Sequence, residues 1–200
     1  TLALAEGVEH QAIVLAELPA LAPSLPASRL LGAEADGLPL ILLDCPALFD
    51  RPGSPYLDAH GDDWVDNGIR FGLLSRVAAL LGQAASPLGW QPDVVHVNDW
   101  QTALAPAWLH YEGGAASVVT VHNIAFQGNF AADLLPALGL PENAWRFDGV
   151  EYHGHTWELG PRKAKEILFT GRAMTAEEVR GTGMVNKVVP RDQLDTETRA

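Results

Sequence analysis

The sequence predicts an α/β fold built around a parallel sheet. Two valine-rich runs, PDVVHV at 92–97 and ASVVTVH at 116–122, are almost continuously apolar, which is typical of strands buried on both faces of a parallel sheet. Apolar side chains also recur at helical spacing from Asn67 to Gln83, and a second helix-like stretch runs from Trp100 to Tyr111. Strands that alternate with helices in this way indicate an α/β domain.

Two further strand-like runs lie nearer the start of the chain. They are EHQAIVLA at 9–16 and LPLILLDC at 38–45. We expect both to lie parallel with the strands at 92–97 and 117–122 in one sheet. The segment at 16–33 is rich in Ala, Leu and Pro, and it predicts a loop with a helical turn.

A long loop is expected at 44–67. This segment holds three prolines, two glycines and many Asp residues, a composition that predicts neither helix nor central strand. A loop of this length in a compact domain is usually functional or disordered, and the aromatic residues Phe49, Tyr56 and Trp64 argue against disorder. The D-x-D-x-D-G order of a calcium loop is absent, so we expect no metal site here.

The last part of the chain has a different composition. All three lysines and both methionines follow Glu158, whereas all six tryptophans and all seven histidines precede it. With 200 residues the chain has room for about one ordinary domain and a short appendage. We therefore expect a domain at 1–157, a second segment at 158–200 and a junction near 156–160, with chance variation as the alternative.

That second segment predicts a short helical and strand-forming tail. A helix is expected at 161–171, and Thr175 with Glu178 forms a capping-box pattern that begins another one. MVNKVVP at 184–190 suits a short strand that ends at its proline.

Charge and cysteine content exclude several classes of partner. The formal charge is −12 and the sequence pI is about 4.8, so most of the surface repels nucleic acid and anionic membranes. The longest apolar run, at 39–43, is far shorter than a membrane span requires. Cys45 is the one cysteine, which excludes an internal disulfide and fits a cytoplasmic protein.

Polar side chains follow both valine-rich strands at the point where each strand is expected to end. HVNDW at 96–100 brings Asp99 there, and TVHN at 120–123 brings His122 and Asn123. Ligands bind beyond the carboxyl ends of parallel strands, so these groups are candidates for one shared crevice. Two alternatives stay open: Asp99 can cap the helix that follows it, and His122 can be a hydrogen-bonded core histidine.

Several long motifs together carry a family resemblance. The stretches LFDRPGSPYLDAHGDDWVDN, RFGLLSRVAAL, WQPDVVHVNDWQTALAPAWL, TVHNIAFQGNF and DGVEYHG resemble, in this order, the N-terminal domain of bacterial glycogen synthase and plant starch synthase. The resemblance covers roughly residues 9–155. It implies part of the first of two Rossmann-like domains, in a glycosyltransferase that moves glucose from ADP-glucose to an α-1,4-glucan with retention of configuration.

The resemblance also implies roles for individual residues. It places Asp99 and His122 as catalytic residues at the donor glucose, with Tyr56 and Asn123 as substrate-binding residues. The partners that it implies are a nucleotide sugar and an α-glucan, and it implies no cofactor besides ADP-glucose as donor substrate. HVNDW departs from the family's His-Ala-His-Asp-Trp, because Asn98 stands where the family has a second His.

Other family features are missing from this chain. Residues 1–158 contain no lysine and no glycine-rich phosphate loop, whereas a diphosphate leaving group requires such groups to take its charge. The family's Lys-Thr-Gly-Gly-Leu segment would lie before Thr1, and its second domain should follow residue 158. We therefore expect one wall of an active site and an inactive fragment.

A second resemblance begins where the first ends. LGPRKAKEILFTGRAMTAEEVRGTGMVNKVVPRDQL is similar to a segment of the enoyl-CoA hydratase (crotonase) family, over about 159–197. This segment lies after that family's catalytic region, so it implies a structural piece without catalytic groups.

Three functional hypotheses follow. The first is a glycosyltransferase fragment with a crotonase-like tail, the second is an acyl-CoA protein of the crotonase type, and the third is a non-catalytic fusion product. The sequence leaves the oligomeric state open.

Overall fold

The computed structural model describes residues 12–123, 126–146, 149–152, 155–156, 189–190 and 193. The chain divides into two compact units, Thr1–Gly160 and Pro161–Ala200, and every described helix and strand belongs to the first. The helices and most of the strand predicted for the tail lie outside the described residues, and the boundary at 157 stays a prediction. Within the described part, no helix has both the length and the apolarity to cross a membrane.

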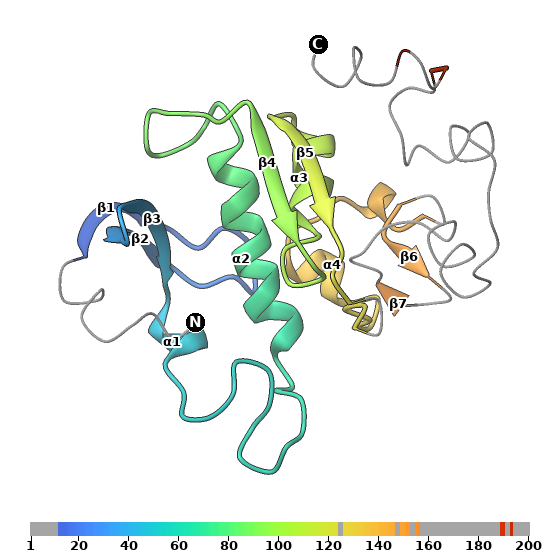
Figure 1. Cartoon of the computed structure of the whole chain (residues 1–200). Helices are drawn as coiled ribbons and strands as arrows, with labels where there is room; N and C mark the ends of the chain where they lie inside the picture. Colours follow the sequence, from blue (N-terminus) through green and yellow to red (C-terminus); the bar gives the residue numbers. More distant parts are fainter. Residues whose placement is uncertain are drawn as a thin grey trace. The chain divides into compact units, whose positions relative to one another are not determined.

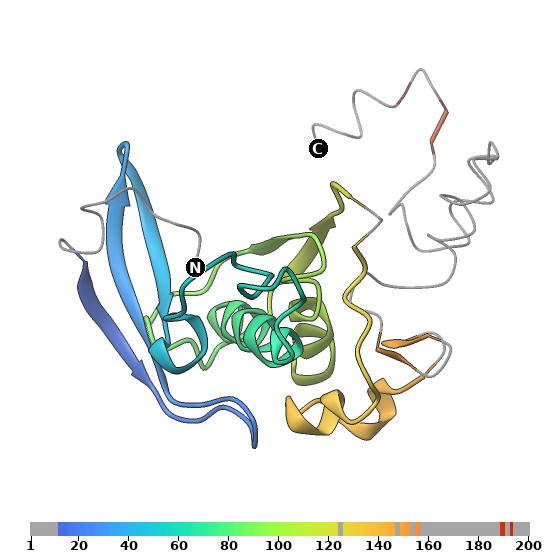
Figure 2. The same cartoon turned by 90° about the horizontal axis from the view of Figure 1, so that it is seen from below.

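The first unit contains seven strands and four α-helices among its described residues (Figure 1). In chain order they are β1 (Ile13–Leu18), β2 (Ser28–Ala35), β3 (Leu38–Asp44), α1 (Pro46–Phe49), α2 (Asn67–Leu81), β4 (Val94–Asn98), α3 (Ala105–Glu112), β5 (Ala116–Thr120), α4 (Leu134–Ala137), β6 (Glu151–Tyr152) and β7 (His155–Thr156), with the 3-10 helix η2 at Glu142–Ala144. In both views α2 lies between the β1–β2–β3 sheet and the β4–β5 pair (Figures 1 and 2).

The parallel pair predicted from the valine-rich runs is present. β4 and β5 pair in parallel, from Val94 opposite Ala116 to Asn98 opposite Thr120, and α3 lies between them in the chain. This strand, helix, strand unit confirms the α/β class. The expectation that both faces are buried is wrong for the described residues: Val97 is buried, but Val94 and Val118 are exposed, and so is Val119, which pairs with Val97.

The expected single parallel sheet is also wrong. β1, β2 and β3 form a separate antiparallel sheet. β2 and β3 are joined by Asp36 and Gly37, which both have positive φ angles, 51° and 77°. Asp-Gly in this conformation makes the tight turn of a β-hairpin, and a hairpin can connect only antiparallel strands. The segment at 16–33, expected to be a loop, contains the end of β1 and much of β2.

The helix predictions hold with two changes. α2 begins at Asn67 as expected. α3 begins at Ala105, because residues 100–104 form turns and a proline lies in its first turn, where proline is favoured. The loop at 44–67 includes the one-turn helix α1, which also has a proline in its first turn, so the expectation of no helix there is wrong.

The core lies around α2 and α3. Trp108 on α3 is fully buried, as are Leu73 of α2 and Leu30 of β2, and Val77 of α2 is buried beside them. α4 packs close to α2 because α2 carries Gly68, where an added Cβ would lie 2.9 Å from Leu134 of α4. A smaller cluster of buried residues, Phe71, Trp100 and Ala103, lies apart from this core and next to the candidate site.

Candidate functional site

Asp99 follows the last residue of β4 in an unusual backbone conformation. Its φ angle is 54°, a left-handed conformation that non-glycine residues adopt rarely and Asp more readily than most. Its backbone N–H donates to the carbonyl of Thr120 at 2.8 Å, which ties the end of β4 to the end of β5. Such conformations cluster at functional sites, where the surrounding structure maintains them.

The Asp99 carboxylate binds His122 and Asn123, the second and third residues after the end of β5. Its Oδ1 accepts the backbone N–H of His122 at 2.6 Å and that of Asn123 at 3.4 Å. Its Oδ2 lies 3.0 Å from Nδ1 of the His122 ring. Three of the four predicted site residues therefore meet at the carboxyl ends of β4 and β5.

Both structural alternatives for these residues are wrong. α3 begins at Ala105 with no side-chain cap, and the Asp99 carboxylate is used by His122 and Asn123 instead. The His122 side chain is 62% exposed, so it is not a core histidine. Because Nδ1 faces the carboxylate, the ring leaves Nε2 as the nitrogen able to meet a ligand.

These contacts determine the ionisation of Asp99. Partial burial alone would raise its pKa, but the hydrogen bonds from the backbone and ring of His122 and from the Asn123 N–H outweigh it and lower the pKa below its usual value. Asp99 is thus a carboxylate at neutral pH, with a negative charge oriented by three donors.

Acid should release this arrangement. Because the folded pKa of Asp99 is below the unfolded value of about 3.9, the carboxylate stabilises the folded state above that value. This stabilisation is lost as the pH falls through the lower folded pKa. We expect faster amide hydrogen exchange at His122 and Asn123, relative to intrinsic rates, only below about pH 4. The transition should disappear in Asp99→Asn, and a midpoint well above pH 4 would contradict the assignment.

Further hydrogen bonds fix the two strand ends. The His96 ring Nε2 lies 2.7 Å from the Thr120 hydroxyl. The Thr102 hydroxyl donates to the Asn98 carbonyl at 2.8 Å and accepts its N–H at 2.9 Å. His96 therefore ties β4 to β5 before Asp99, and Thr102 ties the end of β4 to the turn that follows Asp99.

Tyr56, the fourth predicted residue, lies in the loop after α1 and is 41% exposed. The loop is held by a two-fold ion pair between Arg51 and Asp66, and the Arg51 guanidinium lies 5.0 Å from the centre of the Trp64 ring. Asn67 donates to the Tyr56 carbonyl at 2.9 Å.

A row of aromatic rings connects Tyr56 with the neighbour of Asp99. The Tyr56 and Phe71 ring centres are 5.7 Å apart, Phe71 and Trp100 are 4.8 Å apart, and Trp100 and Phe130 are 5.8 Å apart. Trp100 directly follows Asp99 in the chain. No motif in the sequence indicates this row, because its members lie far apart along the chain.

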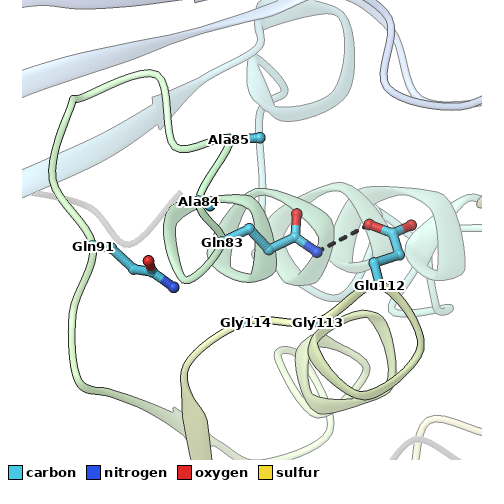
Figure 3. A pocket seen from close by; sticks show the side chains of 7 residues that line it. All are labelled: Gln83, Ala84, Ala85, Gln91, Glu112, Gly113 and Gly114. Atoms are coloured by element: carbon cyan, nitrogen blue, oxygen red, sulfur yellow. Dashed lines mark hydrogen bonds between the residues drawn. The ribbon is translucent and has the colours of Figure 1, made fainter.

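A cavity of about 530 Å³ lies at the other end of the β4–β5 pair. The residues that line it lie at or just after the ends of α2 and α3, or in the segments that lead into β4 and β5. Gln83 donates a hydrogen bond to Glu112 across the cavity at 3.0 Å (Figure 3). The lining residues are Gln83, Ala84, Ala85, Gln91, Glu112, Gly113 and Gly114. None of the four predicted site residues is among them.

Cationic groups are already engaged in the described part of the chain. Arg29, Arg51 and Arg76 each form an ion pair with a carboxylate, and Arg70 is buried. Among the described residues, no three His, Cys, Asp or Glu side chains gather as a metal site.

Comparison with known proteins identifies a protein family whose model matches this chain. The model of the starch synthase catalytic domain matches residues 9–178, which passes the predicted junction at 156–160. A glycogen synthase of Dechloromonas aromatica (strain RCB) is 75% identical over 142 residues, which cover 71% of this chain and 29% of that protein. A glycogen synthase of Nitrosospira multiformis is 49% identical over 164 residues, which cover 72% of this chain and 33% of that protein. The chain thus spans about a third of the length of these relatives.

A solved structure shares the fold. The catalytic domain of starch synthase IV from Arabidopsis thaliana, bound to ADP and acarbose, matches with a TM-score of 0.55 and 24% identity, over 74% of this chain and 31% of that one. This likeness supports the predicted Rossmann-like α/β class.

Proposed function

The chain belongs to the starch synthase catalytic domain family, and we propose that it forms the donor-glucose wall of a glucosyltransferase that moves glucose from ADP-glucose to an α-1,4-glucan. The observation that carries this proposal is the Asp99 carboxylate, held by His122 and Asn123 where β4 and β5 end. Carboxyl ends of parallel strands are the usual place for a ligand in such folds.

The proposed chemistry follows from the charge of this group. Glycosyl transfer passes through a transition state with oxocarbenium-like positive charge on the sugar. A carboxylate that is ionised and already oriented can stabilise such charge without reorganising. We assign this role to Asp99, with His122 contacting the donor glucose through its exposed ring. Tyr56 and Asn123 are the proposed substrate-binding residues.

The proposed ligands are a nucleotide sugar and an α-glucan, with ADP-glucose as donor and no further cofactor. The Arabidopsis relative was solved with ADP and acarbose, which supports both classes of ligand. The buried free thiol of Cys45 supports a reducing cytoplasm as the location.

Binding measurements test this function against the other hypotheses. We expect ADP-glucose to bind weakly but saturably, with a clear loss of affinity in Asp99→Asn, a variant of nearly the same size. Glycogen should compete or bind independently, and an acyl-CoA should not bind. Saturable binding of an acyl-CoA without binding of ADP-glucose would contradict the proposal and favour the crotonase hypothesis. Failure of all three ligands would leave the non-catalytic product.

We also propose that residues 159–197 are a crotonase-like piece joined near 156–160. The change in Lys, Met, Trp and His usage at Glu158 and the motifs AKEILFTGR and GMVNKVVP support this origin. The family match, which continues to residue 178, supports the alternative that the first half of the segment belongs to the synthase domain.

Truncation after Glu158 separates these two readings. If the segment is an appended piece, the shortened protein should melt within a few degrees of the whole chain, since a loss of 1 kcal/mol shifts the midpoint by roughly 2–4 °C in a protein of this size. A loss of about 10 °C or more, measured by circular dichroism, would show that the segment is integral to the domain. Truncation after residue 178 provides the matched comparison.

A further inference from the structure

Arg70 on α2 is a buried cation whose role the proposed site does not explain. It is 2% exposed. Its Nε donates to the Leu48 carbonyl at 2.9 Å, and its Nη1 donates to the Pro55 carbonyl at 2.8 Å and to Oδ1 of Asn67 at 2.7 Å. All three acceptors are neutral oxygens, so the guanidinium is used here as a rigid multi-donor fork.

Asn67, the first residue of α2, adds a hydrogen bond to the next loop residue, Tyr56. Its side chain is also buried, at 3% exposed. While Oδ1 accepts from Arg70, Nδ2 donates to the Tyr56 carbonyl at 2.9 Å. Arg70 and Asn67 therefore hold two consecutive carbonyls, those of Pro55 and Tyr56.

Arg70 also lies against the ring on which Tyr56 packs. Its guanidinium is 5.6 Å from the centre of the Phe49 ring and 5.5 Å from that of Phe71. Phe71 in turn lies between Tyr56 and Trp100. One side chain thus contacts both the backbone that carries Tyr56 and the aromatic row that leads to Asp99.

We propose that Arg70 is a positioning residue, which fixes the Tyr56 ring over Phe71 and so presents the phenol to the donor sugar. This rests on the proposed function, because it assumes that Tyr56 binds substrate. An aliphatic side chain could fill the same volume, but it would leave the Leu48 and Pro55 carbonyls without their donors. A lysine would keep the charge and lose the fork geometry.

The position of Tyr56 can be measured without a ligand. In Arg70→Lys we expect the nuclear Overhauser contacts between the Tyr56 and Phe71 rings to disappear. Arg76→Lys is the matched control: it lies on the same helix and pairs with Glu112 at 2.6 Å, away from the loop, and it should keep these contacts. Unchanged Tyr56 and Phe71 contacts in Arg70→Lys would overturn the proposal. Should that variant not fold, Asn67→Ala removes the hydrogen bond to the Tyr56 carbonyl and should give the same result.

A double-mutant cycle tests whether Arg70 acts on the ligand through Tyr56. Arg70→Lys should weaken ADP-glucose binding by about tenfold in the chain with Tyr56, and by much less in a Tyr56→Ala background. An equal loss in both backgrounds would assign Arg70 a general structural role and overturn the proposal. If the unmodified chain binds no ADP-glucose, the proposed function fails, and the ring contacts alone then decide whether Arg70 positions Tyr56.

Discussion

Replacing Trp108 with alanine is expected to lower the free energy of unfolding of the first unit by about 3–5 kcal/mol. Trp108 is 0% exposed and belongs to the main core. The guanidinium of Arg76 lies 5.6 Å from the centre of its ring. Truncation therefore removes a large apolar surface and leaves a cavity that helices α2 and α3 cannot close without moving. A loss of this size is a large fraction of the stability of an ordinary domain.

Two variants act as controls for this prediction. Trp90→Ala removes the same side chain at a position that is 54% exposed. The free energy of unfolding, measured with denaturant, should therefore change by less than about 0.5 kcal/mol. Trp108→Phe should lose much less than Trp108→Ala, because the indole N–H has no hydrogen-bond partner among the described residues and phenylalanine removes this buried donor. Equal losses in the two alanine variants would contradict the packing described here.

The purified chain should transfer no measurable glucose from ADP-glucose to glycogen. The leaving group of this reaction is a diphosphate, whose negative charge must be neutralised in the transition state. Residues 1–158 contain five arginines and no lysine, and Arg29, Arg51 and Arg76 are paired with carboxylates. Loss of one such stabilising group typically costs about 3–4 kcal/mol of activation free energy, and residues 1–158 contain no lysine to supply one.

Labelled glucose in ADP-glucose provides the assay. The full-length glycogen synthase of Dechloromonas aromatica is a suitable positive control, because it is 75% identical over the matched residues and this chain covers 29% of its length. Incorporation of label by the chain alone, retained after repurification and lost in Asp99→Asn, would show that the chain neutralises the diphosphate by itself.

The sequence predicted the parts of the fold that depend on strong local patterns. α2 follows from its helical spacing, and the valine-rich runs identified β4 and β5 and the polar residues that end them. The hairpin of β2 and β3 was missed, although the Asp36-Gly37 pair is a strong turn signal. Apolar composition alone could not distinguish antiparallel from parallel strands at 38–45.

The candidate site was predictable in part for a related reason. Asp99 and His122 end neighbouring parallel strands, so topology alone brings them together. Tyr56, Phe71, Trp100 and Phe130 instead meet through tertiary packing of two loops, the helix α2 and a turn, and no spacing in the sequence indicates that. The burial of Arg70 was equally unpredictable from the sequence, because a single arginine in a helix is usually solvent-exposed.

Asp99 and His122 are proposed to contact the donor glucose. A titration with ADP-glucose, followed through the ring nitrogens of all histidines by NMR, tests it most directly. We predict a saturable shift at His122 Nε2 and at the Asn123 amide, no shift at His110 on α3, and no response at His122 in Asp99→Asn. Saturable shifts confined to the side-chain amides of Gln83 and Gln91, in the cavity at the opposite ends of β4 and β5, with His122 unchanged, would contradict it.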